Sequence, residues 1–216
     1  MNKIDVLQRI RDIGLIPVVR AESADQAMRA VAAIKAGGVS VLEITMTVPG
    51  AIDVIEKLAA VYGSEALIGA GTVLDPETAA RCIQAGAQFI VSPALNEETI
   101  ACCRTNDVAI FPGALTPTEV VRAWNAGADA VKIFPAGAVG GASYLKALKA
   151  PLPQIELIPT GGVSLKTAAD FIKAGAMALG VGADLVDPKA LRDGNEGLIT
   201  ERARQFLEIV REARRN

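Results

Sequence analysis

The chain has 216 residues, 51% of them hydrophobic, and a formal net charge of −2. It is long enough to bury a large core, and its composition excludes a disordered or fibrous protein. The small net charge and an aromatic fraction of 4% argue against nucleic acid or an anionic membrane as a partner. No uninterrupted apolar run predicts a signal peptide or a membrane span, so we expect a cytoplasmic protein.

Histidine is absent, and three cysteines are present. The lack of histidine excludes Ser-His-Asp and Cys-His nucleophile systems and histidine-ligated zinc, which leaves lysine, carboxylates, tyrosine and backbone groups for chemistry. Cys82, Cys102 and Cys103 have no CxxC spacing, and their odd number argues against a disulfide framework. A lysine enzyme that needs no metal and no organic cofactor is compatible with this composition.

Short β-branched runs alternate with longer amphipathic stretches along the chain. The predicted strands are 15–19, 41–45, 67–70, 89–91, 109–111, 130–134, 156–159 and 178–181. The predicted helices between them include 24–36, 51–62, 76–85, 97–104, 117–125 and 165–174. A charged, glycine-rich segment, 187–197, is predicted to be a loop before a final amphipathic helix over 199–214.

Three helix starts carry a recognisable signal. Asp75 before Pro76 and Thr116 before Pro117 have the pattern of an N-cap residue followed by proline at the first helical position. Ser164 is expected to cap the helix that would begin at residue 165.

The helices before the second, fourth, sixth and eighth strands all end in Ala-Gly and a small residue. These triplets are 36–38, 85–87, 126–128 and 174–176, and each is expected to place glycine in a left-handed helix C-cap. Their association with even strands favours a closed (β/α)8 TIM barrel, with an additional N-terminal helix, over a doubly wound α/β fold. Since no linker is visible, residues 1–216 are predicted to form a single domain.

Lys132 and Glu43 each interrupt an apolar strand, and alternation points both into the barrel from opposite walls. A buried ammonium is costly to desolvate, so such a lysine tends to lose its proton and become a nucleophile, with the carboxylate moving protons. Two other interpretations remain open. The lysine could lie at a sheet edge with its head in water, or the two groups could form a structural ion pair.

Active sites of such barrels lie at the C-terminal strand ends. Strand one ends at Arg20, strand three runs into Thr72 and strand four into Pro93. After strands seven and eight, two glycine-rich turns offer bare backbone amides that a phosphate could approach, in the triplets 160–162 and 180–182.

The order and spacing of several motifs are those of one family. They are PVVR (17–20), LEIT (42–45), TVPGA (47–51), IGAGTV (68–73), FIVSP (89–93), FPGALTPTE (111–119), VKIFPA (131–136), IPTGGV (158–163) and GVGADLV (180–186). The chain resembles the class I 2-keto-3-deoxy-6-phosphogluconate (KDPG) aldolases, a family that also includes 4-hydroxy-2-oxoglutarate (KHG) aldolases.

The resemblance implies that Lys132 forms a Schiff base and that Glu43 is the acid/base. The substrate-binding residues that we expect are Arg20, Thr72, Pro93, Phe134, Thr160, Gly161, Gly162 and Gly182, with Thr72 near the pyruvyl carboxylate and the glycines holding phosphate. It also implies a homotrimer that acts in carbohydrate metabolism of the Entner–Doudoroff type.

The chain departs from the family pattern at two positions. Thr47 stands where some members have an arginine, and Ala183 stands where many have a serine that could donate to phosphate. The expected reaction is cleavage of KDPG to pyruvate and glyceraldehyde 3-phosphate, and also of KHG to pyruvate and glyoxylate. The alternatives are a phosphosugar isomerase or epimerase barrel, and a catalytically silent oligomeric scaffold that binds sugar phosphates.

Overall fold

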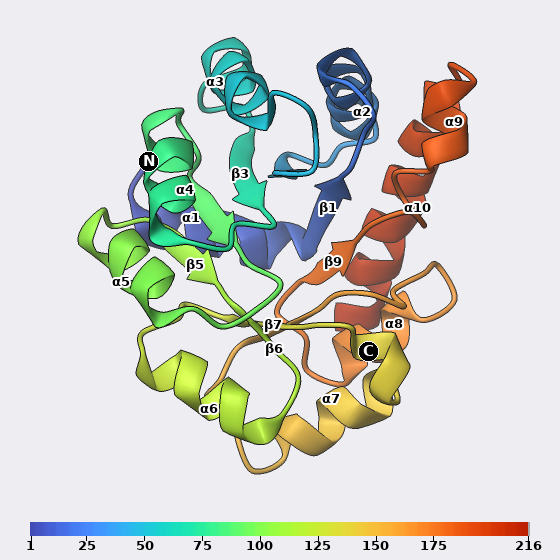
Figure 1. The fold of residues 1–216 in the computed structure, drawn as a ribbon. Coiled ribbons are helices and arrows are strands. Elements are labelled where there is room, and N and C mark those ends of the chain that lie inside the picture. Colours follow the sequence, from blue (N-terminus) through green and yellow to red (C-terminus); the bar gives the residue numbers. More distant parts are fainter. Residues whose placement is uncertain (216) are drawn as a thin grey trace.

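The structure is a computed structural model, and it describes residues 1–215 (Figure 1). The strands are β1 (Leu15–Val19), β2 (Val41–Thr45), β3 (Leu67–Gly71), β4 (Phe89–Val91), β5 (Ala109–Phe111), β6 (Gly113–Ala114), β7 (Val131–Ile133), β8 (Leu157–Pro159) and β9 (Leu179–Val181). The helices are α1 (Lys3–Ile13), α2 (Ala24–Ala36), α3 (Ala51–Tyr62), α4 (Pro76–Gln84), α5 (Glu97–Thr105), α6 (Pro117–Asn125), η1 (Ala136–Val139), α7 (Ala142–Lys149), α8 (Ala168–Lys173), α9 (Pro188–Arg192) and α10 (Glu196–Arg215). No helix in the described part of the chain is both long and apolar enough to span a bilayer.

The strands form two parallel sheets, and the helices lie around them (Figure 1). A six-stranded sheet has the order β5-β4-β3-β2-β1-β9, and a three-stranded sheet has the order β6-β7-β8. Two isolated bridges, Leu157 to Ala176 and Thr160 to Gly180, join the end of the small sheet to the segment around β9. The α/β class with a curled parallel sheet is thus confirmed.

Pro112 separates β5 from β6, a strand that the sequence did not predict. Proline has no amide hydrogen and cannot continue a ladder of hydrogen bonds. On one side of Pro112, β5 pairs with β4, and on the other side β6 pairs with β7. The chain therefore passes from the large sheet to the small one at this residue.

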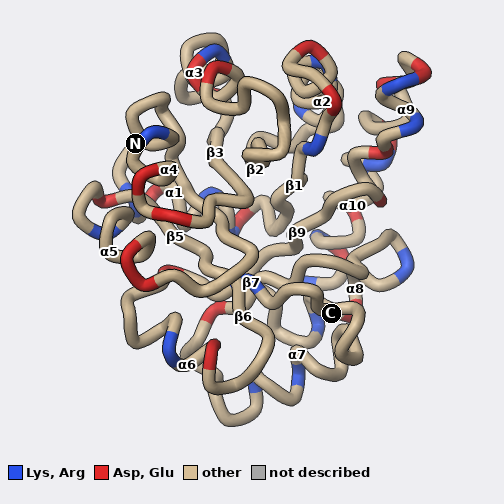
Figure 2. The backbone as a smooth tube through the Cα atoms, in the orientation of Figure 1, with Lys and Arg blue, Asp and Glu red and all other residues tan. Residues whose placement is uncertain are grey.

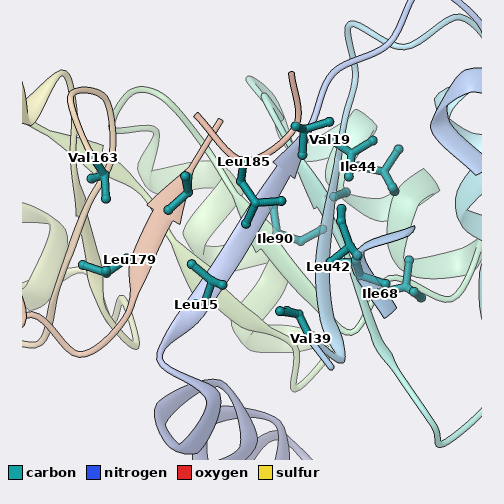
Figure 3. Packing of buried hydrophobic residues seen from close by; sticks show 14 of the residues in the cluster. Leu15, Val19, Val39, Leu42, Ile44, Ile68, Ile90, Val163, Leu179 and Leu185 are labelled. Atoms are coloured by element: carbon teal, nitrogen blue, oxygen red, sulfur yellow. The ribbon is translucent and has the colours of Figure 1, made fainter. Parts of the chain in front are cut away.

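The two faces of the strands belong to two different apolar clusters, as the predicted alternation requires. On β2, Leu42 and Ile44 pack in the large cluster under the helices, which Figure 3 shows beside the outward residues of β1. Val41 belongs instead to an inner cluster, together with Val6 and Ile10 of α1. The inner faces of the strands thus enclose their own core, and α1 contributes to it.

α1 also bonds to the segments that lead into the N-terminal strand ends. Arg9 donates to the carbonyl of Ser64, shortly before β3, at 2.8 Å. Lys3 forms an ion pair with Asp129, just before β7, at 3.0 Å. α1 therefore closes the N-terminal end of the sheet interior.

Two of the predicted helix starts are confirmed. The Asp75 side chain accepts from the amide of Thr78 at 2.7 Å, and Pro76 is the first helical residue. Thr116 forms a capping box with Glu119, in which each side chain accepts from the other residue's backbone.

The predicted cap at Ser164 is wrong, because α8 begins three residues after the expected start. The Ser164 amide donates to Thr167 Oγ1 at 2.9 Å, and its carbonyl accepts from the amides of Thr167 and Ala168 at 3.1 and 2.9 Å. Thr167 Oγ1 in turn donates to the carbonyl of Gly162 at 3.0 Å. The hydroxyl of Thr167 therefore shapes a turn that links α8 to the loop after β8.

The prediction of a continuous loop over 187–197 is also wrong, since α9 lies within it. Asp187 caps this short helix by accepting from the amides of Lys189 and Ala190 at 2.8 and 3.1 Å, with Pro188 in the first turn. The sequence also gave no position for η1 and α7, which occupy the connection from β7 to β8.

The left-handed glycines of the repeated triplets are confirmed in three of the four copies. These have φ values of 98°, 99° and 96°, at Gly86, Gly127 and Gly175. In the first copy the prediction is wrong: Gly37 has φ −78°, and Gly38 adopts the left-handed conformation with φ 92°. Gly37 serves close packing instead, because a Cβ there would lie 2.5 Å from Cβ of Ala203 on α10.

Candidate active site

Glu43 and Lys132 are the only buried charged side chains within residues 1–215, with exposed fractions of 2% and 3%. Charged positions are otherwise concentrated on the outer helices and loops, as Figure 2 shows. Glu43 comes from β2 in the large sheet and Lys132 from β7 in the small one. Because a buried charge is costly, this pair is the clearest candidate for a functional site.

Both side chains point into the enclosed interior. Val41 and Ala130, two residues before them on the same strand faces, belong to the inner apolar cluster. The interpretation of Lys132 as a lysine with its head in water is wrong, since it is almost fully buried. Within the described residues no ion pair joins Lys132 to Glu43, although the Lys132 charge acts electrostatically on Glu43. Lys132 Nζ lies 5.3 Å from the centroid of the Phe134 ring.

The Glu43 carboxyl is a buried acid, and one of its oxygens has no hydrogen-bond partner. Its Oε1 is buried and accepts no hydrogen bond. Burial raises the pKa of Glu43, and the positive charges of Lys132 and then Arg20 oppose that rise. A carboxyl that holds its proton more readily than usual can both give and take a proton, as general acid and base catalysis requires.

Thr72 follows β3 in a strained conformation. Its φ of 59° places a β-branched residue in the left-handed region, where such side chains are rare. Strain of this kind persists only where the surrounding structure enforces it, and it is common at binding sites. It supports the prediction that Thr72 contributes to the site.

Six of the predicted substrate-binding residues line one cavity of about 190 Å³, namely Arg20, Phe134, Thr160, Gly161, Gly162 and Gly182. Val18, Ala183 and Asp184 line it as well. Val18 was missed, although strand alternation from Arg20 would have found it. Asp184 lies within the GVGADLV motif, but the sequence assigned no role to it.

The loop of Gly161 and Gly162 has the geometry of an anion-binding turn. Both residues have φ 80°, which a residue with a side chain rarely adopts. Their neighbours in η1 hold the outer side of the loop: the amide of Ala136 donates to the Thr160 carbonyl at 2.9 Å, and that of Gly137 to the Gly161 carbonyl at 2.8 Å. Successive glycine amides in such a turn can receive an anion.

Pro93 and Thr72 lie outside the cavity of about 190 Å³. The backbone of Pro93 packs against Gly113, where a Cβ would come within 2.2 Å of its carbonyl. Gly113 is the register partner of Lys132 on the neighbouring strand. Phe134, which lines the cavity and lies near Lys132, connects the lysine with the cavity.

Thr47 has limited hydrogen-bonding capacity. Thr45 Oγ1 donates to the Val19 carbonyl at 3.1 Å and lies 2.6 Å from Thr47 Oγ1. A hydroxyl has one proton, so Thr47 must be the donor between the two threonines. Its hydroxyl is then an acceptor only, so Thr47 offers no donor to a carboxylate.

Two of the cysteines are unreactive. Burial raises the pKa of Cys82 to about 11 and that of Cys103 to about 12, so both remain protonated thiols at neutral pH. All three cysteines are free, as the argument against a disulfide framework predicted.

The fold and the site define the class: an α/β protein whose interior holds a buried lysine from one parallel sheet and a buried acid from the other. The model of the "KDPG and KHG aldolase" family matches residues 6–201, so the chain belongs to this family of aldehyde-lyases.

Two relatives and one solved structure that the chain resembles have the names of such aldolases. The chain is 35% identical to the 2-dehydro-3-deoxy-phosphogluconate aldolase of Pseudomonas aeruginosa, over 99% of this chain and 96% of that protein. It is 40% identical to the 2-dehydro-3-deoxy-6-phosphogalactonate aldolase of Escherichia coli (strain K12), over 79% and 83%. It is also similar to a structure of KDPG aldolase from Legionella pneumophila with pyruvate captured as a covalent carbinolamine. In that comparison the TM-score is 0.85, the identity 31% and the coverage 92% and 96%.

Proposed function

We propose that the protein is a class I aldolase that cleaves KDPG to pyruvate and glyceraldehyde 3-phosphate, and also KHG to pyruvate and glyoxylate. The observation that carries this proposal is the pair of buried charged groups, Lys132 and Glu43, which face one interior next to a cavity at the strand ends. Membership of the KDPG and KHG aldolase family supports it.

In the proposed mechanism, the neutral amine of Lys132 attacks the C2 ketone of the substrate. The resulting carbinolamine loses water and becomes a protonated imine, which accepts electrons. Glu43, directly or through a water, removes the proton of the C4 hydroxyl, so that the C3–C4 bond breaks and the aldehyde leaves. Glu43 then returns a proton to C3 of the enamine, and hydrolysis frees pyruvate and the amine.

The two halves of the substrate are assigned to the two parts of the site. Thr72 and Pro93 would line the pyruvyl end beside Lys132. The phosphate would lie in the cavity, held by the amides of Gly161, Gly162 and Gly182, with Arg20 and Thr160 nearby. Ala183 offers no hydroxyl there, at a cost on the order of 1 kcal/mol for one neutral hydrogen bond.

The 40% identity to a 2-dehydro-3-deoxy-6-phosphogalactonate aldolase favours a second candidate substrate, the galactonate analogue of KDPG. The two substrates differ at C4, where the proposed proton transfer takes place. Values of kcat/KM measured side by side for both compounds will assign the preference.

We further propose that residues 1–216 form one domain in which the two sheets close into a (β/α)8 barrel. The bridges between β8 and β9 and the continuity of the chain at Pro112 support closure. A homotrimer remains a prediction from the family resemblance, and a cytoplasmic location remains a prediction from the sequence. Sedimentation equilibrium of the purified protein tests the size of the oligomer.

Borohydride reduction in the presence of pyruvate, followed by intact mass and peptide mapping, tests the covalent mechanism. We expect a pyruvyl adduct confined to Lys132 and none on Lys132→Met. Absence of an adduct on the folded wild-type protein would remove the Schiff base from the mechanism. Turnover by Lys132→Arg would instead support an isomerase or epimerase, because that reaction needs no covalent lysine.

A further inference from the structure

Gly69 and Gly71 lie on the inner face of β3, and the backbone conformation at these positions does not require glycine. Both lie within a regular strand, and neither has a positive φ. Glycine weakens a strand interior, and its presence there often marks the close approach of another group. At Gly69 that group is the ring of Phe89, which a Cβ would meet at 2.3 Å.

At Gly71 the approaching group is Glu43. A Cβ at this position would lie 1.9 Å from Oε1, 2.5 Å from Cδ and 2.6 Å from Cγ of Glu43. The carboxyl end of Glu43 therefore lies across the bare Cα of Gly71. Since non-bonded carbon atoms pack at about 3.5–4.0 Å, no side chain fits at position 71 while the carboxyl stays in place.

Little else fixes the Glu43 carboxyl. Its Oε1 accepts no hydrogen bond, and the side chain is in no ion pair within the described residues. The strand beneath it is well held, because the amide of Met46 donates to the Gly71 carbonyl at 2.8 Å and Thr45 is paired with Gly71 in register. The position of the carboxyl thus depends on the shape of its surroundings.

We propose that Gly71 is a positioning residue for Glu43: the missing side chain forms the slot in which the carboxyl lies, and this slot determines where Glu43 exchanges its proton. The inference rests on the proposed aldolase function, and it assigns a role to the second glycine of the IGAGTV motif. Gly71 would act through Glu43.

The test is Gly71→Ala, measured with two reactions of pyruvate. Borohydride trapping reports on Lys132, and exchange of the pyruvate C3 protons in D₂O, followed by NMR, reports on the acid/base. We expect trapping to persist and exchange to fall by about 100-fold, the cost of a misplacement near 1 Å. Gly69→Ala is the matched control, because it adds the same methyl group on the same strand face, where it meets Phe89 instead of Glu43. This control should lower the melting temperature. It should change the exchange rate by less than about threefold, far below the loss that a displaced acid/base causes.

A second pair of variants isolates the contact with Glu43. In a Glu43→Ala background the added methyl no longer meets a carboxyl, so Gly71→Ala should leave both the melting temperature and the residual exchange unchanged. If Gly71→Ala alone does not fold, the double variant should fold. Equal losses in both backgrounds, an unfolded double variant or wild-type exchange in Gly71→Ala would each overturn the role of Gly71. Failure of the wild-type protein to trap pyruvate would instead refute the aldolase proposal.

Discussion

At the scale of single residues, the burial of Glu43 has a consequence for stability. The pKa of Glu43 is raised in the folded protein from its ordinary value of 4.5, chiefly by burial. Above pH 4.5 the carboxyl therefore ionises more readily in the unfolded chain than in the folded one, which lowers the free energy of unfolding as pH rises. Below that pH both states are protonated, and the penalty disappears.

Glu43→Gln should therefore raise the melting temperature at neutral pH, and this gain should vanish as pH falls below 4.5. Thermal unfolding of both proteins across a pH series measures it. A gain that is independent of pH would mean that packing of the amide, and not the loss of an ionisable group, is responsible.

The sequence predicted that the side chains of Lys132 and Glu43 point into the interior, because strand alternation depends only on local order. It could not predict whether they form an ion pair, since β2 and β7 belong to different sheets. Their separation depends on how the sheets meet. The cavity could be predicted only in part for the same reason: Val18 follows from alternation, and Asp184 does not.

At the scale of elements, Thr167 connects α8 with the glycine loop after β8. Thr167→Val keeps the shape but removes the hydrogen bonds to Gly162 and Ser164, each worth about 1 kcal/mol. We expect lower stability and a higher KM for phosphorylated substrate, with pyruvate trapping unchanged.

Thr200→Val is the matched control, because its hydroxyl donates to the Ala33 carbonyl at 2.9 Å, away from the cavity. It should reduce stability by about 1 kcal/mol and leave KM unchanged. If both variants change KM alike, Thr167 has no specific role at the loop.

Helix ends were predictable where a side chain caps them. Asp187 before Pro188 repeats the cap signal seen at Asp75 and Thr116. The start of α9 could therefore have been predicted from the sequence, although a loop was predicted there. α7 follows Gly141 without a side-chain cap, and nothing local marks its start. Tertiary packing determines such an element.

At the scale of the whole molecule, substitutions on α1 measure how much the inner core contributes to the stability of the fold. Ile10 is fully buried in that core, whereas Ile4 on the same helix is 77% exposed. Ile10→Ala should lower the free energy of unfolding by about 2–5 kcal/mol. Ile4→Ala should change it by less than about 0.5 kcal/mol, and urea denaturation of both variants measures the difference.

α1 closes the N-terminal end of the interior that holds Lys132, and the cavity lies at the C-terminal strand ends. We therefore expect substrate to enter, and products to leave, at the C-terminal strand ends. Under the proposed mechanism the aldehyde would then block the path of the water that hydrolyses the pyruvyl imine. Release would be ordered, with the aldehyde first and pyruvate second, so pyruvate should be a competitive product inhibitor and the aldehyde should not.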